Sequence, residues 1–67
     1  MKVYVLTRFS AFDEEVFVDV APSKKKAEKM HREKHPHMIP DTLSRDGKWI
    51  WHDRDTMEFL SVIEKEI

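Results

Sequence analysis

The first third of the chain alternates apolar and polar positions in the way that paired strands do. Residues 2–8 (KVYVLTR) are rich in β-branched and aromatic side chains and carry apolar groups on both alternating faces, which is typical of a central strand. Residues 16–20 (VFVDV) alternate strictly. The small and acidic residues 9–15 between them indicate a hairpin loop longer than a tight turn. We therefore expect an antiparallel hairpin at the start of the chain.

One helix is predicted after this hairpin. Ser23 is placed to accept hydrogen bonds from the free N–H groups of a first helical turn, and residues 24–35 all tolerate helix. Pro36 ends the helix because proline has no N–H and restricts the residue before it. The apolar face is thin, essentially Ala27 and Met30, so we expect the helix to lie across one face of a sheet.

The second half of the chain predicts the closing strands. Residues 48–52 (KWIWH) follow an Asp-Gly turn and indicate a third strand. Residues 56–67 are ambiguous: Asp55 and Glu58 form a helical capping-box pair, whereas a strand would supply the antiparallel partner that residues 48–52 need. We favour the strand. The predicted fold is α+β, a small four-stranded antiparallel sheet packed on one helix in the order ββαββ, with a second helix at residues 56–67 as the alternative.

A lone helix covers only one face of such a sheet, and this asymmetry is the main functional lead. Beneath the helix we expect a core made of Val3, Val5, Leu6, Val16, Val18, Ala27, Met30, Ile50, Phe59 and Ile63. Apolar side chains on the opposite face would be exposed to solvent or would contact another chain. The residues expected there are Tyr4, Phe17, Trp49, Trp51, Leu60 and Val62. In the connection formed by residues 37–45, the rim of the core is expected to be plugged by Met38, Ile39 and Leu43.

Length, charge and cysteine content narrow the protein class. A length of 67 residues supports one core, so we expect a single domain, residues 1–67. The absence of cysteine fits a reducing cytoplasm. The 12 Lys and Arg residues are balanced by 13 Asp and Glu residues, which argues against attraction of the whole protein to nucleic acid or anionic membranes. No apolar run approaches the ~20 residues of a membrane span, so no membrane association is expected.

Catalytic and metal-binding motifs are weak in this sequence. A single glycine excludes the phosphate-cradling loops, and no nucleophile elbow or carboxylate pair is present, so we predict a protein without catalysis or cofactor. His31, His35 and His37 follow a spacing that could present imidazoles to Zn or Ni. No cysteine or suitably spaced carboxylate completes the ligand set, and the neighbouring Lys and Arg side chains repel a cation. An acid–base pair of His35 and His37 is the weakest alternative.

Two surfaces are candidates for binding. Phe9 and Phe12 lie in the hairpin loop beside the acidic residues 13–15, where they either anchor a partner protein or fold back over the sheet edge. Tyr4, Trp49 and Trp51 join them as candidate partner-binding residues, although core packing is the stronger interpretation of the two tryptophans.

The second candidate surface is basic. The helix carries Lys25, Lys29 and Arg32, which could neutralise phosphates and give a nucleic-acid-binding protein. The basic residues of this segment are spread around the helix and do not form one stripe, which is also how an ordinary solvent-exposed helix looks. Nucleic acid is therefore the alternative partner and not the favoured one.

The segments KVYVLTR and EEVFVDVAPSKKKAEK together resemble the opening of short bacterial and phage proteins of unknown function. In those proteins a hairpin ends in a small-residue turn, and a Ser-capped helix and one or two closing strands follow. The resemblance implies binding more than turnover, and a location in the cytoplasm, or in the host cytoplasm for a phage protein. Our leading hypothesis is a small non-catalytic protein-binding module that docks on a partner or associates with a second copy of itself.

Overall fold

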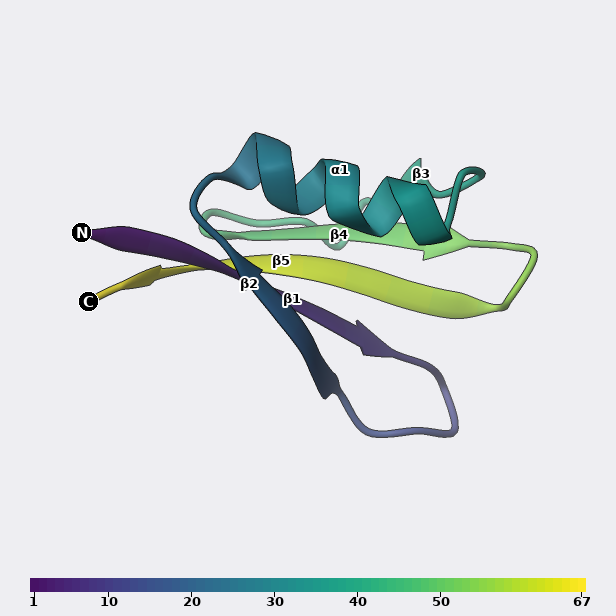
Figure 1. The fold of residues 1–67 in the computed structure, drawn as a ribbon. Coiled ribbons are helices and arrows are strands. Elements are labelled where there is room, and N and C mark those ends of the chain that lie inside the picture. The colour runs from purple at the N-terminus through teal and green to yellow at the C-terminus, as the bar shows by residue number, and fades with distance from the viewer.

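The computed structural model describes all 67 residues and consists of one antiparallel sheet and one helix (Figure 1). The elements are β1 (Lys2–Phe9), β2 (Val16–Ala21), α1 (Lys24–Lys34), β3 (Ile39–Pro40), β4 (Lys48–Asp53) and β5 (Glu58–Glu66). The strands lie in the order β2-β1-β5-β4-β3, and α1 covers one face of the sheet. The α+β class is therefore confirmed.

The C-terminal segment is a strand, and it occupies the centre of the sheet. β5 pairs with β1 on one side and with β4 on the other, which satisfies the backbone groups of all three strands. The sheet has five strands and not four, so the element order is ββαβββ. The additional strand is β3, which pairs Ile39 with His52 and Pro40 with Trp51. Proline is tolerated there because β3 is an edge strand.

Local chemistry fixes the two ends of α1. The Ser23 hydroxyl accepts a hydrogen bond from the Lys26 N–H at 3.2 Å, as expected for an N-terminal cap. At the other end the His35 N–H donates to the His31 carbonyl at 2.9 Å, and Pro36 follows. The buried core under the helix consists of Leu6, Ala21, Ala27, Met38, Trp51, Leu60 and Val62, with Tyr4, Val18, Met30 and Trp49 packed at its margin.

The expected assignment of the two sheet faces is wrong for most residues, although Leu6, Ala27, Val18 and Met30 lie in the core or at its margin as expected. Cross-strand partners share a face, so the pairs Leu6–Val62, Trp49–Val62 and Trp51–Leu60 place these side chains together beneath α1. The side chains expected in the core that lie on the opposite face are Val3, Val5, Ile50, Phe59 and Ile63, and Val16 is exposed. Both faces of β1 and β5 are apolar, so alternation alone does not say which one the helix covers. The indole rings bury the most apolar area, and they lie with the helix.

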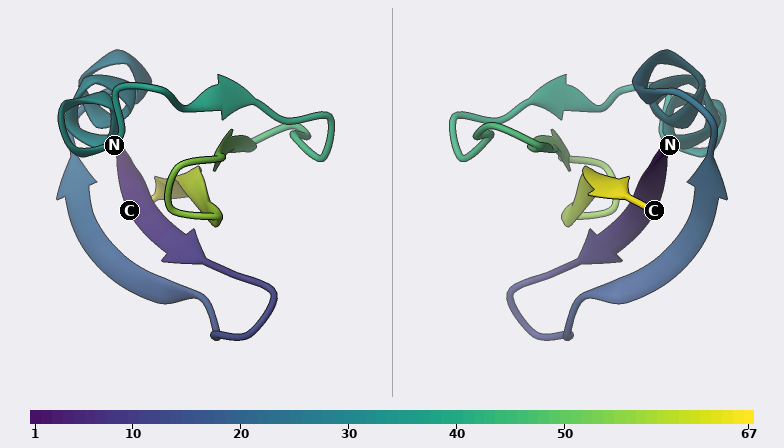
Figure 2. Two further views of the ribbon diagram at one scale, coloured as in Figure 1. Left: turned by 90° about the vertical axis from the view of Figure 1, so that its right-hand side faces the viewer. Right: turned by 90° about the vertical axis from the view of Figure 1, so that its left-hand side faces the viewer.

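The face of the sheet without the helix is closed at its centre by polar groups. The sheet is strongly twisted, and the β1–β2 hairpin bends away from the plane of β4 and β5 (Figures 1 and 2). The Glu15 Oε2 atom accepts hydrogen bonds from the Thr7 hydroxyl at 3.0 Å and from the Lys48 ammonium at 3.2 Å. The Thr7 and Ser61 hydroxyls are also hydrogen-bonded to one another, and both residues are buried. This polar cluster interrupts the apolar side chains of that face.

The two chain ends lie side by side. The Ile67 N–H donates to the Met1 carbonyl at 2.8 Å, and the terminal amine of Met1 lies 3.2 Å from a Glu66 carboxylate oxygen. The hairpin loop and the β4–β5 turn lie together at the other end of the sheet (Figure 1). The hairpin loop and the β4–β5 turn thus lie at the end of the sheet away from the termini.

Candidate functional site

A groove lies between the hairpin loop and the β4–β5 turn. It is lined by residues 8–14, Val16, His52 and residues 56–59, and we call it the hairpin-end groove. Of the candidate partner-binding residues, Phe9 and Phe12 line it. Tyr4, Trp49 and Trp51 do not, because they pack on the core beneath α1.

The floor of the groove is a stack of three aromatic rings from three strands. The centroids of Phe9 and Phe59 are 5.2 Å apart with an interplanar angle of 11°, and those of His52 and Phe59 are 4.7 Å apart with an angle of 23°. These residues are direct cross-strand partners, so the sheet itself fixes the stack. The groove therefore has a rigid, largely apolar floor.

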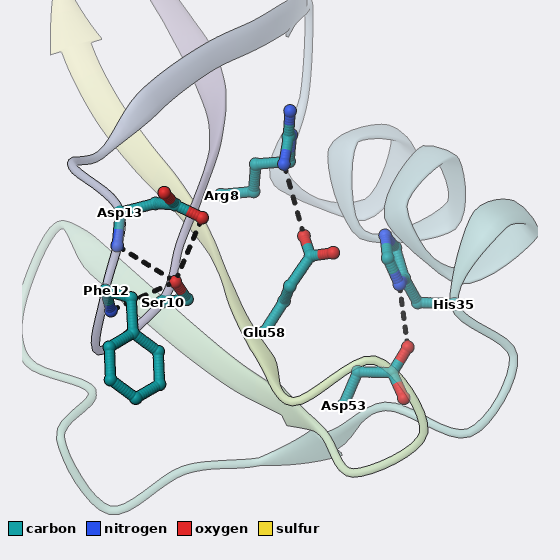
Figure 3. Close-up of polar contacts among 7 residues, drawn as sticks. All are labelled: Arg8, Ser10, Phe12, Asp13, His35, Asp53 and Glu58. Carbon is teal, nitrogen blue, oxygen red and sulfur yellow. Dashed lines mark hydrogen bonds and ion pairs between the residues drawn. The ribbon is translucent and has the colours of Figure 1, made fainter.

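The hairpin loop is held by one serine side chain. The Ser10 hydroxyl accepts hydrogen bonds from the N–H groups of Phe12 (3.2 Å) and Asp13 (3.0 Å), and it lies 3.3 Å from an Asp13 carboxylate oxygen (Figure 3). Such a serine turn restricts the loop backbone. Phe12 stands at the tip with 96% of its surface exposed, and its ring points away from the other labelled side chains.

The two loop phenylalanines differ in their surroundings. Phe9 folds back onto the sheet, where it stacks on Phe59. Phe12 is the exposed one, and only its backbone is held by the loop. The position of Ser10 two residues before Phe12 is the sequence signal for this ordered turn.

Met57, in the β4–β5 turn, also lines the groove. It was not among the candidate binding residues predicted from the sequence. It is 67% exposed and has a backbone φ of 59°, in the left-handed region that favours glycine or asparagine. A side chain with a Cβ in this conformation costs about 1–2 kcal/mol. Methionine has no preference for the left-handed backbone region, so sequence patterns alone could not have identified Met57.

The charge around the groove is mainly negative. Arg8 and Glu58 form an ion pair with a nitrogen–oxygen distance of 3.5 Å (Figure 3). Asp13 and Glu14 line the groove and take part in no ion pair, whereas Glu15 is paired with Lys48. Two uncompensated carboxylates therefore remain beside the aromatic floor.

A buried His–Asp pair ties the end of α1 to the end of β4 near this site. His35 Nδ1 and Asp53 Oδ2 are 2.7 Å apart, and Asp53 Oδ1 accepts a hydrogen bond from the Asp55 N–H at 2.9 Å (Figure 3). The hydrogen bond from His35 lowers the pKa of the Asp53 carboxyl, against the opposing effect of burial. The pair fixes the start of the turn that carries Met57.

The three histidines considered as metal ligands are not brought together. His31 lies on the buried side of α1, where its Nε2 atom is 2.9 Å from the Ser61 carbonyl oxygen, and burial lowers its pKa. His35 is bonded to Asp53, and His37 is exposed. No group of three or more His, Cys, Asp or Glu side chains is arranged to hold a metal ion.

The basic candidates lie on the outward side of α1. Lys25, Lys29 and Arg32 are exposed and take part in no ion pair, and together with Ser23, Lys26 and Glu28 they line a shallow depression. At 100° per residue these three side chains fall within one sector of the helix, so they form a basic stripe, while the other basic residues of α1 lie around it. This stripe contains no exposed large apolar side chain.

Comparison of the chain with protein-family models, with curated proteins and with solved structures finds no match. The helix is too short and too polar to cross a membrane. The chemical character of the two surfaces is therefore the basis on which a function is proposed.

Proposed function

We propose that this protein is a small non-catalytic protein-binding module that docks on another protein through the hairpin-end groove. The observation that carries the proposal is the placement of Phe12, almost fully exposed on an ordered turn at the rim of an aromatic groove. Aromatic side chains dominate interface hot spots. A loop that is already ordered also loses less conformational entropy on binding.

The rim residues support the proposal because they contribute little to the fold. Phe12 buries almost none of its ring, so a polar residue would serve the turn equally well. Met57 occupies a backbone conformation in which glycine is less strained. Backbone strain and exposed apolar side chains tend to gather at interaction sites, and here both occur on the rim of one groove.

The proposal is tested by comparing two exposed phenylalanines. Phe12→Ala removes the rim residue, whereas Phe17→Ala removes a residue that is 64% exposed on β2 and lies outside the groove. Immobilised wild type and both variants would be incubated with lysate of the source organism, and the affinity for any captured protein would then be measured with the purified components. We expect Phe12→Ala to weaken binding by at least roughly 30-fold, the effect of losing a hot spot, and Phe17→Ala to change it less than about twofold.

Two outcomes would contradict the proposal. One is a partner that binds wild type and Phe12→Ala equally well. The other is an equal loss of binding in both variants, which would move the interface to β2. Both side chains are exposed, so far-ultraviolet circular dichroism should show the same fold in all three proteins.

A second candidate function is nucleic-acid binding through α1. It is favoured by one observation, the unpaired charges of Lys25, Lys29 and Arg32 within one sector of the helix. Binding of a labelled single-stranded RNA or DNA should then fall steeply with salt, and it should be lost when the three residues are replaced together by glutamine. Absence of binding at low salt would end this candidate.

A further inference from the structure

We infer that the hairpin-end groove receives a positively charged segment of another protein, one that places a large apolar side chain between Phe12 and Met57. This inference rests on the proposed function, because it names the chemistry of the partner at the same site. It adds a sign of charge and a type of side chain, both of which can be tested separately from binding itself.

The charged residues that line the groove determine which sign of charge the partner segment should carry. They comprise one positive side chain, Arg8, and three negative ones, Asp13, Glu14 and Glu58. Arg8 and Glu58 compensate one another, so the remaining charge comes from Asp13 and Glu14. Complementary potentials steer association and select partners, while like charges placed against each other oppose binding. A segment rich in Lys or Arg is therefore the favoured occupant.

The acidic rim is also held in place. The Asp13 carboxylate lies beside the Ser10 hydroxyl, and the same hydroxyl accepts from the N–H of Asp13. The carboxylate is thus oriented before a partner arrives, so less conformational entropy is lost when a cation binds to it.

The shape of the groove determines the second requirement. Phe12 from the hairpin loop and Met57 from the β4–β5 turn both line the groove and are exposed, and the ring stack of Phe9, Phe59 and His52 lines it as well. An apolar side chain seated here removes the two exposed rim residues and itself from water, which is the favourable term in most protein association. A purely basic segment would pair with the carboxylates of Asp13 and Glu14 but would leave the apolar surface of the groove exposed to solvent.

A second copy of this chain does not fit these requirements. A symmetric contact through the groove would bring two net-negative grooves together, so the unpaired carboxylates Asp13 and Glu14 of both copies would repel one another. The basic stripe of α1 has the right charge, but no large apolar side chain is exposed along that helix. A different protein is therefore the occupant that the charges favour.

The experiment uses a display library of random short peptides selected on the immobilised full-length protein, with Phe12→Ala as the counter-selection. Enriched peptides should carry a net positive charge and at least one Leu, Ile, Met, Phe or Trp. A synthetic version of an enriched peptide is then titrated against Glu14→Lys and Glu33→Lys. Both glutamates are exposed and unpaired, and only Glu14 lines the groove.

We expect Glu14→Lys to weaken peptide binding at least roughly tenfold at low salt, and Glu33→Lys to change it less than about twofold. Glu14→Gln should give a smaller loss in the same direction, which keeps the test usable if the lysine variant folds poorly. Phe12-dependent peptides that are neutral or acidic, or an affinity unchanged by Glu14→Lys, would overturn the charge assignment and leave the proposed function standing.

Two further outcomes are decisive. If no enriched peptide depends on Phe12, the groove is not a docking site and the proposed function fails together with this inference. If light scattering shows a dimer that Phe12→Ala converts to monomer, the occupant is a second copy and the assignment of a cationic partner is overturned.

Discussion

Glu15 and Lys48 form an ion pair at 3.2 Å across the face of the sheet that the helix leaves uncovered, although they are 33 positions apart in the chain. Glu15 lies just before β2, and Lys48 begins β4, so the pair joins the hairpin to the far side of the sheet. The same carboxylate oxygen accepts the Thr7 hydroxyl on β1. The hairpin, and with it Phe12, is therefore fixed relative to the aromatic floor of the groove.

Glu15→Ala should loosen this attachment. We expect a loss of about 1 kcal/mol in the free energy of unfolding, because the pair is partly exposed and screened by water. Urea unfolding would measure it, with Glu14→Ala as the neighbouring control, for which we expect a change within about 0.5 kcal/mol. Equal effects of the two substitutions would show that the ion pair does not hold the hairpin.

Met57→Gly should separate stability from binding. Glycine relieves the left-handed backbone strain of about 1–2 kcal/mol, and its greater freedom in the unfolded chain offsets about 0.5–1 kcal/mol of that gain. Thermal unfolding should therefore show a protein as stable as the wild type or slightly more stable, while the affinity for a groove ligand falls. Met57→Ala should lower affinity without stabilising. A clear loss of stability in the glycine variant would mean that the Met57 side chain supports the fold.

The edge of β2 gives a prediction about self-association. The Asp19 carboxylate accepts a hydrogen bond from the Val20 N–H at 2.8 Å, and β2 is an outer strand with Val16, Phe17 and Val20 exposed. A charged residue on such an edge opposes pairing with another strand. Asp19→Val should therefore raise the mass measured by light scattering as concentration increases, whereas Glu33→Val on the helix should not. A monomeric Asp19→Val protein at high concentration would contradict this role.

Stability should fall when the pH drops below neutrality. Burial lowers the pKa of His31 from its ordinary 6.5, so near that pH the unfolded chain binds a proton that the folded protein does not. The contribution is therefore complete above the ordinary pKa, and it is lost as the pH falls from that value through the lowered pKa of the folded protein. The Asp53 carboxyl, whose pKa is also lowered, adds a second loss at more acidic pH.

Urea unfolding at a series of pH values would check this pH dependence. His31→Gln removes the titration, and its side-chain amide retains a donor for the Ser61 carbonyl. We expect the loss of stability just below pH 6.5 to be largely absent in this variant. An identical pH dependence in wild type and His31→Gln would assign it to another group.

The elements that depend on neighbouring residues were predictable from the sequence. The strict alternation of residues 16–20 and the Ser23 cap followed by Pro36 are local signals, and β2 and α1 lie where those signals indicate. Residues 56–67 needed a non-local reason, namely the unpaired strand before them, and this reason correctly favoured a strand.

The remaining features depend on contacts between distant residues. Val5 and Leu6 are equally apolar, so nothing local says that Leu6 faces the helix and Val5 does not. β3 has only two residues, which is too short to leave a pattern. The pairing of His35 with Asp53 and the left-handed backbone of Met57 arise from the folded arrangement, and Met57 lines the candidate site.

The adjacency of Met1 and Ile67 has a practical use. A reporter, a surface attachment or a fused domain placed at either end would project from the side of the molecule away from Phe12 and Met57, so the groove would stay accessible in every assay described above. A short linker could also join the two ends, since their backbones are already hydrogen-bonded. Such a circularly permuted chain could be opened in the exposed turn after Pro40 without disturbing the hairpin that presents Phe12.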